Sequence, residues 1–158
     1  MKKKTPRQKL TKELDDLCRE YVKLRDNYTC QKCGKSGTKQ IHWSHVIPRS
    51  AGNRLRWNKV NSKALCAYCH RRWWHSNPLD AMEWFKDTFP GRYEYLLVEK
   101  SKGSKKFSLD ELEAIKEGFK HDVALLKKAG GITEKTIYDY PATEFDIDNL
   151  DEYEDLPF

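Results

Sequence analysis

Four cysteines of this 158-residue chain stand at spacings that suit a metal site. Cys30 and Cys33 form one Cys-x-x-Cys pair, and 32 residues separate it from a second pair, Cys66 and Cys69. Each pair can place two thiolates on one edge of a metal ion, and two pairs complete the tetrahedron of structural zinc. The alternative, a redox disulfide, needs only one pair in a thioredoxin-like context. Because four sulfurs leave no open coordination position, we expect this Zn²⁺ site to stabilise the fold and not to catalyse.

Histidines between and beside the cysteine pairs could do chemistry. The stretch "HWSHVIPRS", residues 42–50, holds His42 and His45, and His70 directly follows Cys69. A histidine can bind a metal, act as a general base, or be an ordinary half-buried ring in a zinc ribbon. Residues 40–47 are predicted to form a short strand. His42 and His45 would then lie on opposite faces of it and could have different roles.

The ordered set "SHVIPRSAGN…N…LCAYCH" resembles the HNH, or ββα-metal, endonuclease family over residues 28–76. The His-x-x-His start and the flanking helices also look like NinG-type phage recombination nucleases. The resemblance implies that His45 is the general base, which takes a proton from the attacking water, and that Asn61 orients it. It further implies that His70 binds a catalytic divalent ion, Mg²⁺ or Mn²⁺, that Arg49 contacts phosphate, and that the products carry 3′-hydroxyl and 5′-phosphate ends.

The chain departs from the family pattern at two positions. Ser44 stands where the family keeps a metal-binding Asp or His, and we expect His42, two residues earlier on the same strand face, to take over as ligand. Trp74 stands four residues after His70, where some members keep another metal histidine. His75 is one position later, roughly 140° from His70 on an α-helix, and is expected to have only a minor part.

Charge is distributed unevenly along the chain. The net charge is +6, but residues 1–138 carry +14, whereas residues 139–158 hold eight acids and no base. The strongly basic charge of residues 1–138 favours a protein that binds a polyanion, above all DNA, over one that is basic and soluble without such a partner. The predicted DNA-binding residues surround the histidines: Arg49, Arg54, Arg56, Lys59, Arg71 and Arg72. Trp57 and Trp73 are expected in the core, and Trp43 and Trp74 are open for core packing or for stacking on bases.

Apolar spacing predicts helices on both sides of the cysteine-rich segment. One covers residues 6–27, a second begins near Pro78 with Leu79 on its buried side, and a short one follows Pro90-Gly91. Ser108 and Glu111 form a capping box for a helix to about residue 128, with Leu109 on its buried side. A second strand, or a helix starting near residue 65, links the two cysteine pairs.

The predicted fold is α+β, with a small zinc-stabilised ββα-metal core flanked by α-helices and a disordered acidic C-terminal tail. We divide the chain into an N-terminal helical arm (1–27), the zinc-bound HNH nuclease core (28–77), a helical region (78–135) and the acidic tail (136–158). No run of about 18 apolar residues occurs, so no membrane span is predicted. The N-terminus does not read as a secretory signal, and we expect a cytoplasmic protein of a bacterial or phage-infected cell.

The last residues, "DEYEDLPF", resemble the C-terminal tip of bacterial single-stranded DNA-binding protein. Such a tip docks on replication and repair proteins, and the residues that would dock here are Asp155, Leu156, Pro157 and Phe158. Two alternatives are a tail that folds back on the basic body and competes with DNA, and a solubilising arm.

Two functions are compatible with these patterns. The first is a metal-dependent HNH endonuclease that hydrolyses DNA phosphodiester bonds in phage-type recombination, repair or packaging. Since no recognition helix is evident, its cleavage is expected to be structure-selective or weakly sequence-specific. The second is a non-catalytic zinc module that binds DNA or, through its acidic tail, a repair partner.

Overall fold

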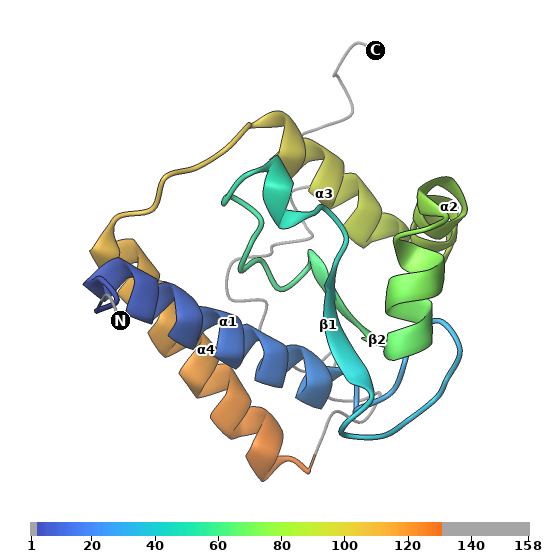
Figure 1. Ribbon diagram of the computed structural model, residues 1–158, viewed down its shortest axis with the longest axis horizontal. Coiled ribbons are helices and arrows are strands. Elements are labelled where there is room, and N and C mark those ends of the chain that lie inside the picture. Colours follow the sequence, from blue (N-terminus) through green and yellow to red (C-terminus); the bar gives the residue numbers. More distant parts are fainter. Residues whose placement is uncertain (1–2, 131–158) are drawn as a thin grey trace.

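The computed structural model describes residues 3–130, whose helices and strands confirm the predicted α+β class. In chain order they are α1 (Pro6–Arg25), β1 (Ile41–His45), η1 (Arg49–Ala51), β2 (Ser62–Cys66), η2 (Cys69–Trp74), α2 (Pro78–Thr88), α3 (Pro90–Ser101) and α4 (Leu109–Lys128). Figure 1 shows the two strands in the middle, with α1 and α4 side by side on one flank and α2 and α3 on the other. The predicted disordered tail lies outside the described residues.

The sheet consists of two antiparallel strands, β1 and β2, paired from Ile41 opposite Cys66 to His45 opposite Ser62. A lone two-stranded sheet is marginally stable in water and needs packing on its faces. Here every residue of β2 is buried, because helices and the cysteine cluster surround this strand. The predicted strand after residue 59 is confirmed, and it continues to Cys66 where a helix was the other option.

Helices α1 and α4 run in the same direction along each other. The ion pairs Glu13–Lys116 and Glu20–Lys127, at 3.4 and 2.6 Å, connect them in order. Capping boxes start both helices, at Thr5 for α1 and, as predicted, at Ser108 for α4. Within residues 3–130 no helix is long and apolar enough to cross a membrane.

Three sequence expectations about the helices were wrong in detail. Leu79 and Leu109 were expected on buried faces, but they are 85% and 44% exposed. Each lies in the first turn of its helix, where the side chain extends past the packed surface. Helix α3 begins at Pro90 itself, because proline lacks the N–H that the first helical residue leaves unpaired.

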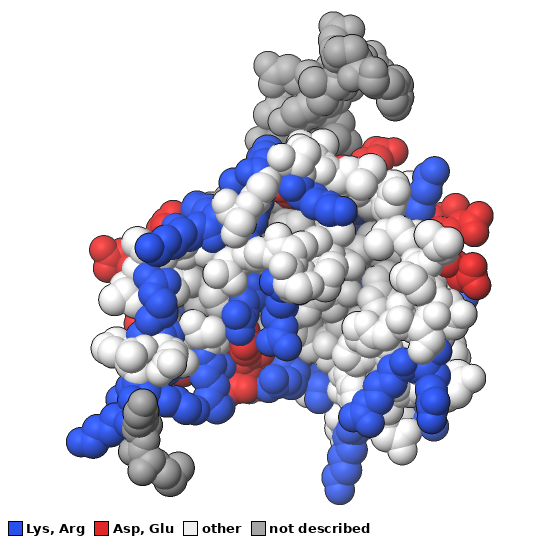
Figure 2. Space-filling view, turned by 45° about the horizontal axis from the view of Figure 1, so that its top comes forward, with Lys and Arg blue, Asp and Glu red and all other residues white. Residues whose placement is uncertain are grey.

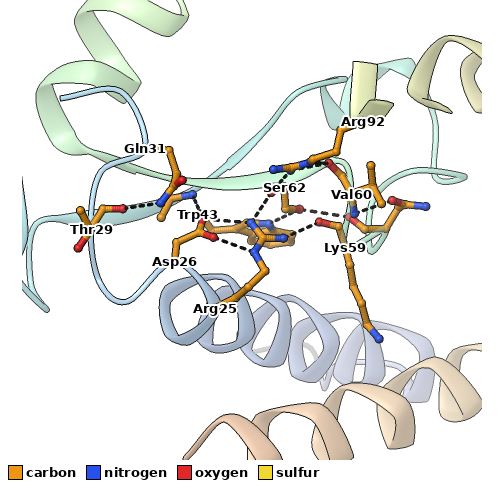
Figure 3. Close-up of polar contacts among 11 residues, drawn as sticks. Arg25, Asp26, Thr29, Gln31, Trp43, Lys59, Val60, Ser62 and Arg92 are labelled. Carbon is orange, nitrogen blue, oxygen red and sulfur yellow. Dashed lines mark hydrogen bonds and ion pairs between the residues drawn. The ribbon is translucent and has the colours of Figure 1, made fainter. Parts of the chain in front are cut away.

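Two arginines from distant helices fasten β2 and the chain just before it (Figure 3). Arg25, at the end of α1, donates to the carbonyls of residues 59 and 62 at 2.9 and 2.7 Å and pairs with Asp26 at 2.8 Å. Arg92, in α3, donates to the carbonyls of residues 60 and 62, each at 2.6 Å. These carbonyls flank Asn61, so the two guanidiniums fix the position of that residue from both sides.

Lys63, in the middle of β2, is fully buried. Its ammonium lies 3.0 Å from the centroid of the Trp74 ring, and its Nζ has no hydrogen-bond partner within the described part of the chain. Burial, together with the nearby charge of Arg92, holds the pKa of Lys63 well below its ordinary value, although Asp26 opposes this. The residue opposite Lys63, Ser44, is equally buried and its Oγ also has no partner there.

Replacing Lys63 with methionine should raise the free energy of unfolding at pH 7 by about 1–3 kcal/mol, because an unsatisfied buried polar group is removed. The wild-type protein should also gain stability as pH rises toward the ordinary lysine pKa of about 10.4, since over that range only the unfolded chain keeps the proton. Urea unfolding of Lys63→Met should lack this gain. Lys100→Met, at an exposed position, is the matched control. A loss of stability in Lys63→Met would mean that cation–π attraction to Trp74 outweighs burial.

Candidate metal centre and nucleic-acid interface

The four predicted zinc ligands come together in one cluster. The sulfurs of Cys30, Cys33, Cys66 and Cys69 all lie within 4.8 Å of one another, and Cys33 Sγ is 3.8 Å from Cys66 Sγ. A tetrahedral ion with Zn–S bonds of about 2.3 Å places its sulfurs about 3.8 Å apart. No disulfide joins any of these cysteines. The cluster therefore has the ligand set and the spacing for a structural metal such as zinc.

Backbone amides prepare one of these thiols for metal binding. Burial raises the pKa of Cys30, but backbone hydrogen bonds from Cys66, Cys33 and Lys32 more than offset it and bring the pKa to about 7. A substantial fraction of this thiol is therefore ionised near neutral pH, and the thiolate is the form that binds a metal.

His42 and His70 meet beside the cysteine cluster. Their Nδ1 atoms are 3.2 Å apart and their ring planes are nearly perpendicular, at 89°. Two imidazole nitrogens bound to one ion at about 2.0–2.1 Å lie roughly 3.0–3.4 Å apart. Burial, and then the nearby charges of His75 and His42, lower the pKa of His70 to about 4, and burial with Arg71 lowers that of His42. Both rings are therefore neutral near pH 7 and can offer lone pairs.

The position of His75 corrects the sequence expectation. Residues 69–74 form a π-helix, η2, in which the hydrogen bonds join residues five apart and bring them onto one face. The His75 ring accordingly lies next to that of His70, with centroids 4.9 Å apart, where an α-helix would separate them. Trp74, one position earlier, is instead buried against Lys63 and Phe85.

His45 is held by a backbone carbonyl. Its Nε2 lies 2.9 Å from the oxygen of Arg56. A carbonyl can only accept, so Nε2 carries the hydrogen and Nδ1 is left with a free lone pair. Burial lowers the pKa of His45 to about 4, although the bond to Arg56 opposes this. The ring is therefore neutral near pH 7 and able to take up a proton.

Asn61 is completely buried and holds the connection between the two strands. Its Nδ2 donates to the carbonyls of Ile47 and Leu55 at 3.0 and 2.9 Å, and its Oδ1 accepts from the Ile47 amide at 2.7 Å. No hydrogen bond joins it to His45 within residues 3–130. Any influence of Asn61 on His45 must therefore pass through the backbone of the loop that follows β1.

Four of the five histidines of the chain, His42, His45, His70 and His75, line a single pocket of about 830 Å³. Its walls come from α1, β1, η1, η2 and the start of α2, and its lining includes four cations, Arg19, Lys23, Lys39 and Arg49, but no carboxylate. Trp43 also lines it, with its ring 4.3 Å from that of His45. Figure 2 shows Lys and Arg on the left, at the top and along the lower part of one face of the molecule, with one acidic patch among them below the centre and the other Asp and Glu toward the edges.

The structure divides the six predicted DNA-binding residues into two groups. Arg49, Arg71 and Arg72 are exposed, and Arg49 lines the pocket and lies 3.7 Å from Asp15. The other three are half-buried and have closer intramolecular partners: Arg54 donates to Gly103 O at 2.8 Å, Arg56 to Asp15 at 2.7 Å, and Lys59 pairs with Asp122 at 2.5 Å. Sequence reasoning missed Arg19, Lys23 and Lys39. The spacing of four between Arg19 and Lys23 puts them on one helix face, but nothing in the sequence indicates that this face borders the histidines.

Comparisons with known proteins give a partial relative and then the family of the chain. The chain is similar to a protein named "Probable HNH endonuclease" from Lactococcus phage SK1, with 34% identity over 58 residues. The match covers 34% of this chain and 62% of the relative, so the chain spans less than two thirds of that protein. The family model "Bacteriophage Lambda NinG protein" matches residues 1–129, and the chain belongs to this family. No solved structure matches the chain.

Removal of the structural metal should unfold the protein, because the free energy of binding a structural zinc is at the same time folding free energy. We expect one zinc per chain by metal analysis, and a large fall in melting temperature on treatment with EDTA. Cys33→Ser, at an exposed position, should lose both the zinc and the fold. Cys18→Ala, a buried thiol outside the cluster, is the control and should keep the zinc. Zinc-free protein with an unchanged melting temperature would contradict the assignment.

Proposed function

We propose that this protein is a metal-dependent HNH endonuclease that hydrolyses DNA phosphodiester bonds during phage recombination, repair or packaging. One observation carries the proposal: the paired rings of His42 and His70 line the same cation-rimmed pocket as His45, whose tautomer is fixed. The family of the chain and the name of the phage relative, "Probable HNH endonuclease", support the same proposal. We place its action in the cytoplasm of an infected cell.

His45 acts as the general base in the proposed mechanism. Nδ1 accepts a proton from the water that attacks phosphorus, while Nε2 keeps its hydrogen bond to the Arg56 carbonyl, which also favours the imidazolium that forms. Because the pKa of about 4 leaves the ring neutral at physiological pH, no prior deprotonation is needed. Asn61 supports this geometry by fixing the loop that runs from His45 to Arg56.

His42 and His70 are proposed to hold the catalytic divalent ion, with His75 beside them. When bound, this ion would neutralise the charge that develops on the scissile phosphate and its leaving 3′ oxygen. Three imidazoles without a carboxylate suit transition metals better than Mg²⁺, which prefers oxygen ligands. Of the two ions expected from the sequence, the donor set thus favours Mn²⁺.

Phosphate binding is assigned to cations around the pocket. Arg49, Arg71 and Arg72 keep the role proposed from the sequence, and the exposed Arg19 and Lys39 and the half-buried Lys23 join them. Arg54, Arg56 and Lys59 would contact DNA only by exchanging their present partners. Contacts to phosphate carry little sequence information, which supports cleavage that is weakly sequence-specific or selective for DNA structure.

The division of the chain is also part of the proposal. Residues 28–77 form the nuclease core, between a helical N-terminal segment (1–27) and a region (78–135) whose described residues are mainly helical. The acidic segment 136–158 lies beyond the described residues. We propose that its end, residues 155–158, docks on a replication or repair protein that recognises tails of single-stranded DNA-binding protein.

Replacing His45 with alanine should lower the cleavage rate by about 10²–10⁴-fold, the usual contribution of a general base, while DNA affinity changes little. The assay would follow supercoiled, linear, branched and single-stranded DNA with Mn²⁺, with Mg²⁺ and with EDTA. His121→Ala, on α4 and away from the pocket, is the control and should cut normally. Wild-type protein that binds DNA but cuts none of these substrates would favour the non-catalytic zinc module.

The neighbouring ring of His75 should contribute to metal affinity. In His75→Ala, we expect the Mn²⁺ concentration needed for half-maximal cleavage to rise about 10-fold or more, with the rate at saturating Mn²⁺ reduced less than in His45→Ala. Wild-type protein should need less Mn²⁺ than Mg²⁺. The same Mn²⁺ requirement in His75→Ala and wild type would restrict His75 to packing.

A further inference from the structure

We propose that Asp15, on the N-terminal helix, is a positioning residue for His45 that acts through Arg56. This inference rests on the proposed function, since it assigns a supporting residue to the proposed base. Asp15 lies 30 residues before His45 in the sequence and makes no direct contact with it among the hydrogen bonds of residues 3–130. The charge of Asp15 raises the pKa of His45 across space, but a constraint on the orientation of the ring can only pass through the residues that Asp15 binds.

The carboxylate of Asp15 binds two neighbouring residues of the loop after η1. Oδ1 accepts from Arg56 Nε at 3.1 Å, and Oδ2 accepts from Arg56 Nη2 at 2.7 Å. Oδ1 also accepts from the indole N–H of Trp57 at 2.9 Å. Three bonds from a side chain that is only 16% exposed fix residues 56 and 57 relative to α1, because a bidentate guanidinium–carboxylate pair restricts orientation as well as distance.

The backbone of Arg56 carries this constraint to the active histidine. Its carbonyl is the group that accepts from His45 Nε2 at 2.9 Å. The carbonyl selects the tautomer and the ring orientation of His45, so its place decides whether Nδ1 faces the pocket ready to accept a proton. Asp15 itself is held by α1, whose neighbouring Leu14 and Cys18 belong to the buried core.

The charge of Asp15 argues against a role in DNA affinity. Its Oδ2 lies 3.7 Å from Nη1 of Arg49, the cation proposed to bind phosphate. A carboxylate at this position partly neutralises that cation and repels a polyanion, so it should weaken DNA binding. We therefore assign this carboxylate a role in catalysis, through the positioning of His45, and not a role in DNA binding.

These opposite effects define the experiment. In Asp15→Asn, an amide replaces one acceptor oxygen and the bidentate pair cannot form. We expect kcat to fall about 10–100-fold, the usual effect of a group that orients an active-site residue, while the Kd for DNA stays the same or decreases. The matched control is Glu13→Gln, which removes another carboxylate of α1, paired with Lys116 of α4 at 3.4 Å and outside the pocket lining. It should leave kcat unchanged.

A spectroscopic readout separates this inference from the nuclease assignment. Nitrogen-15 NMR of the imidazole rings should show the Nε2–H tautomer for His45 in wild type and in Glu13→Gln, and a mixture of tautomers in Asp15→Asn. If wild type does not cut DNA, the proposed function fails, but the tautomer still tests the positioning. Arg56→Gln should reproduce the defect, and the double variant should be no worse than either single variant, because both act through one contact. Wild-type kcat and tautomer in folded Asp15→Asn would overturn the inference.

Discussion

The meeting of four cysteine sulfurs within 4.8 Å of one another, a cluster that could hold a structural metal such as zinc, is the constraint on which the rest of this structure depends. Cys30 and Cys33 follow α1, whereas Cys66 ends β2 and Cys69 begins η2, so a metal bound by all four would fix the end of the strand at the start of the next helix. That junction sets where His70 lies relative to His42 on the paired strand. A two-stranded sheet could not hold this arrangement by itself. The buried arginine bonds to β2 and the helix pair α1–α4 complete the support.

Local chemistry made much of the fold predictable from the sequence. The capping box at Ser108, the proline start of α2 and the two Cys-x-x-Cys pairs act over a few residues, and each is found where it was expected. Burial in the first turns of helices was less predictable, as Leu79 and Leu109 show. Apolar spacing indicates which face of a helix is buried, but it does not indicate how far along the helix the element packed against that face extends. Contacts across the chain, such as those of Arg25 and Arg92 with β2, leave no periodic signal.

The candidate site was predictable in its residue types but not in its connections. The sequence indicates His42, His45 and His70, and the structure brings all three to one pocket. It does not indicate that the Arg56 carbonyl holds His45, since a backbone group has no sequence signature. Nor does it indicate the acid on α1 that binds Arg56, because the two are 41 residues apart. Lys63 shows the converse, a cation that sequence patterns place at the surface and the fold buries.

The π-helical turn of η2 has a consequence for how relatives are aligned. In this turn the residue that lies on the same face as His70 is His75, five positions later, whereas in an α-helix it would be the residue four positions later. A relative with an α-helix here would place the equivalent ring four residues after its first histidine. An ungapped alignment would pair that histidine with Trp74 and score a lost ligand where the ring is present. An alignment should therefore allow a one-residue insertion in this helix before a relative is judged to lack this histidine.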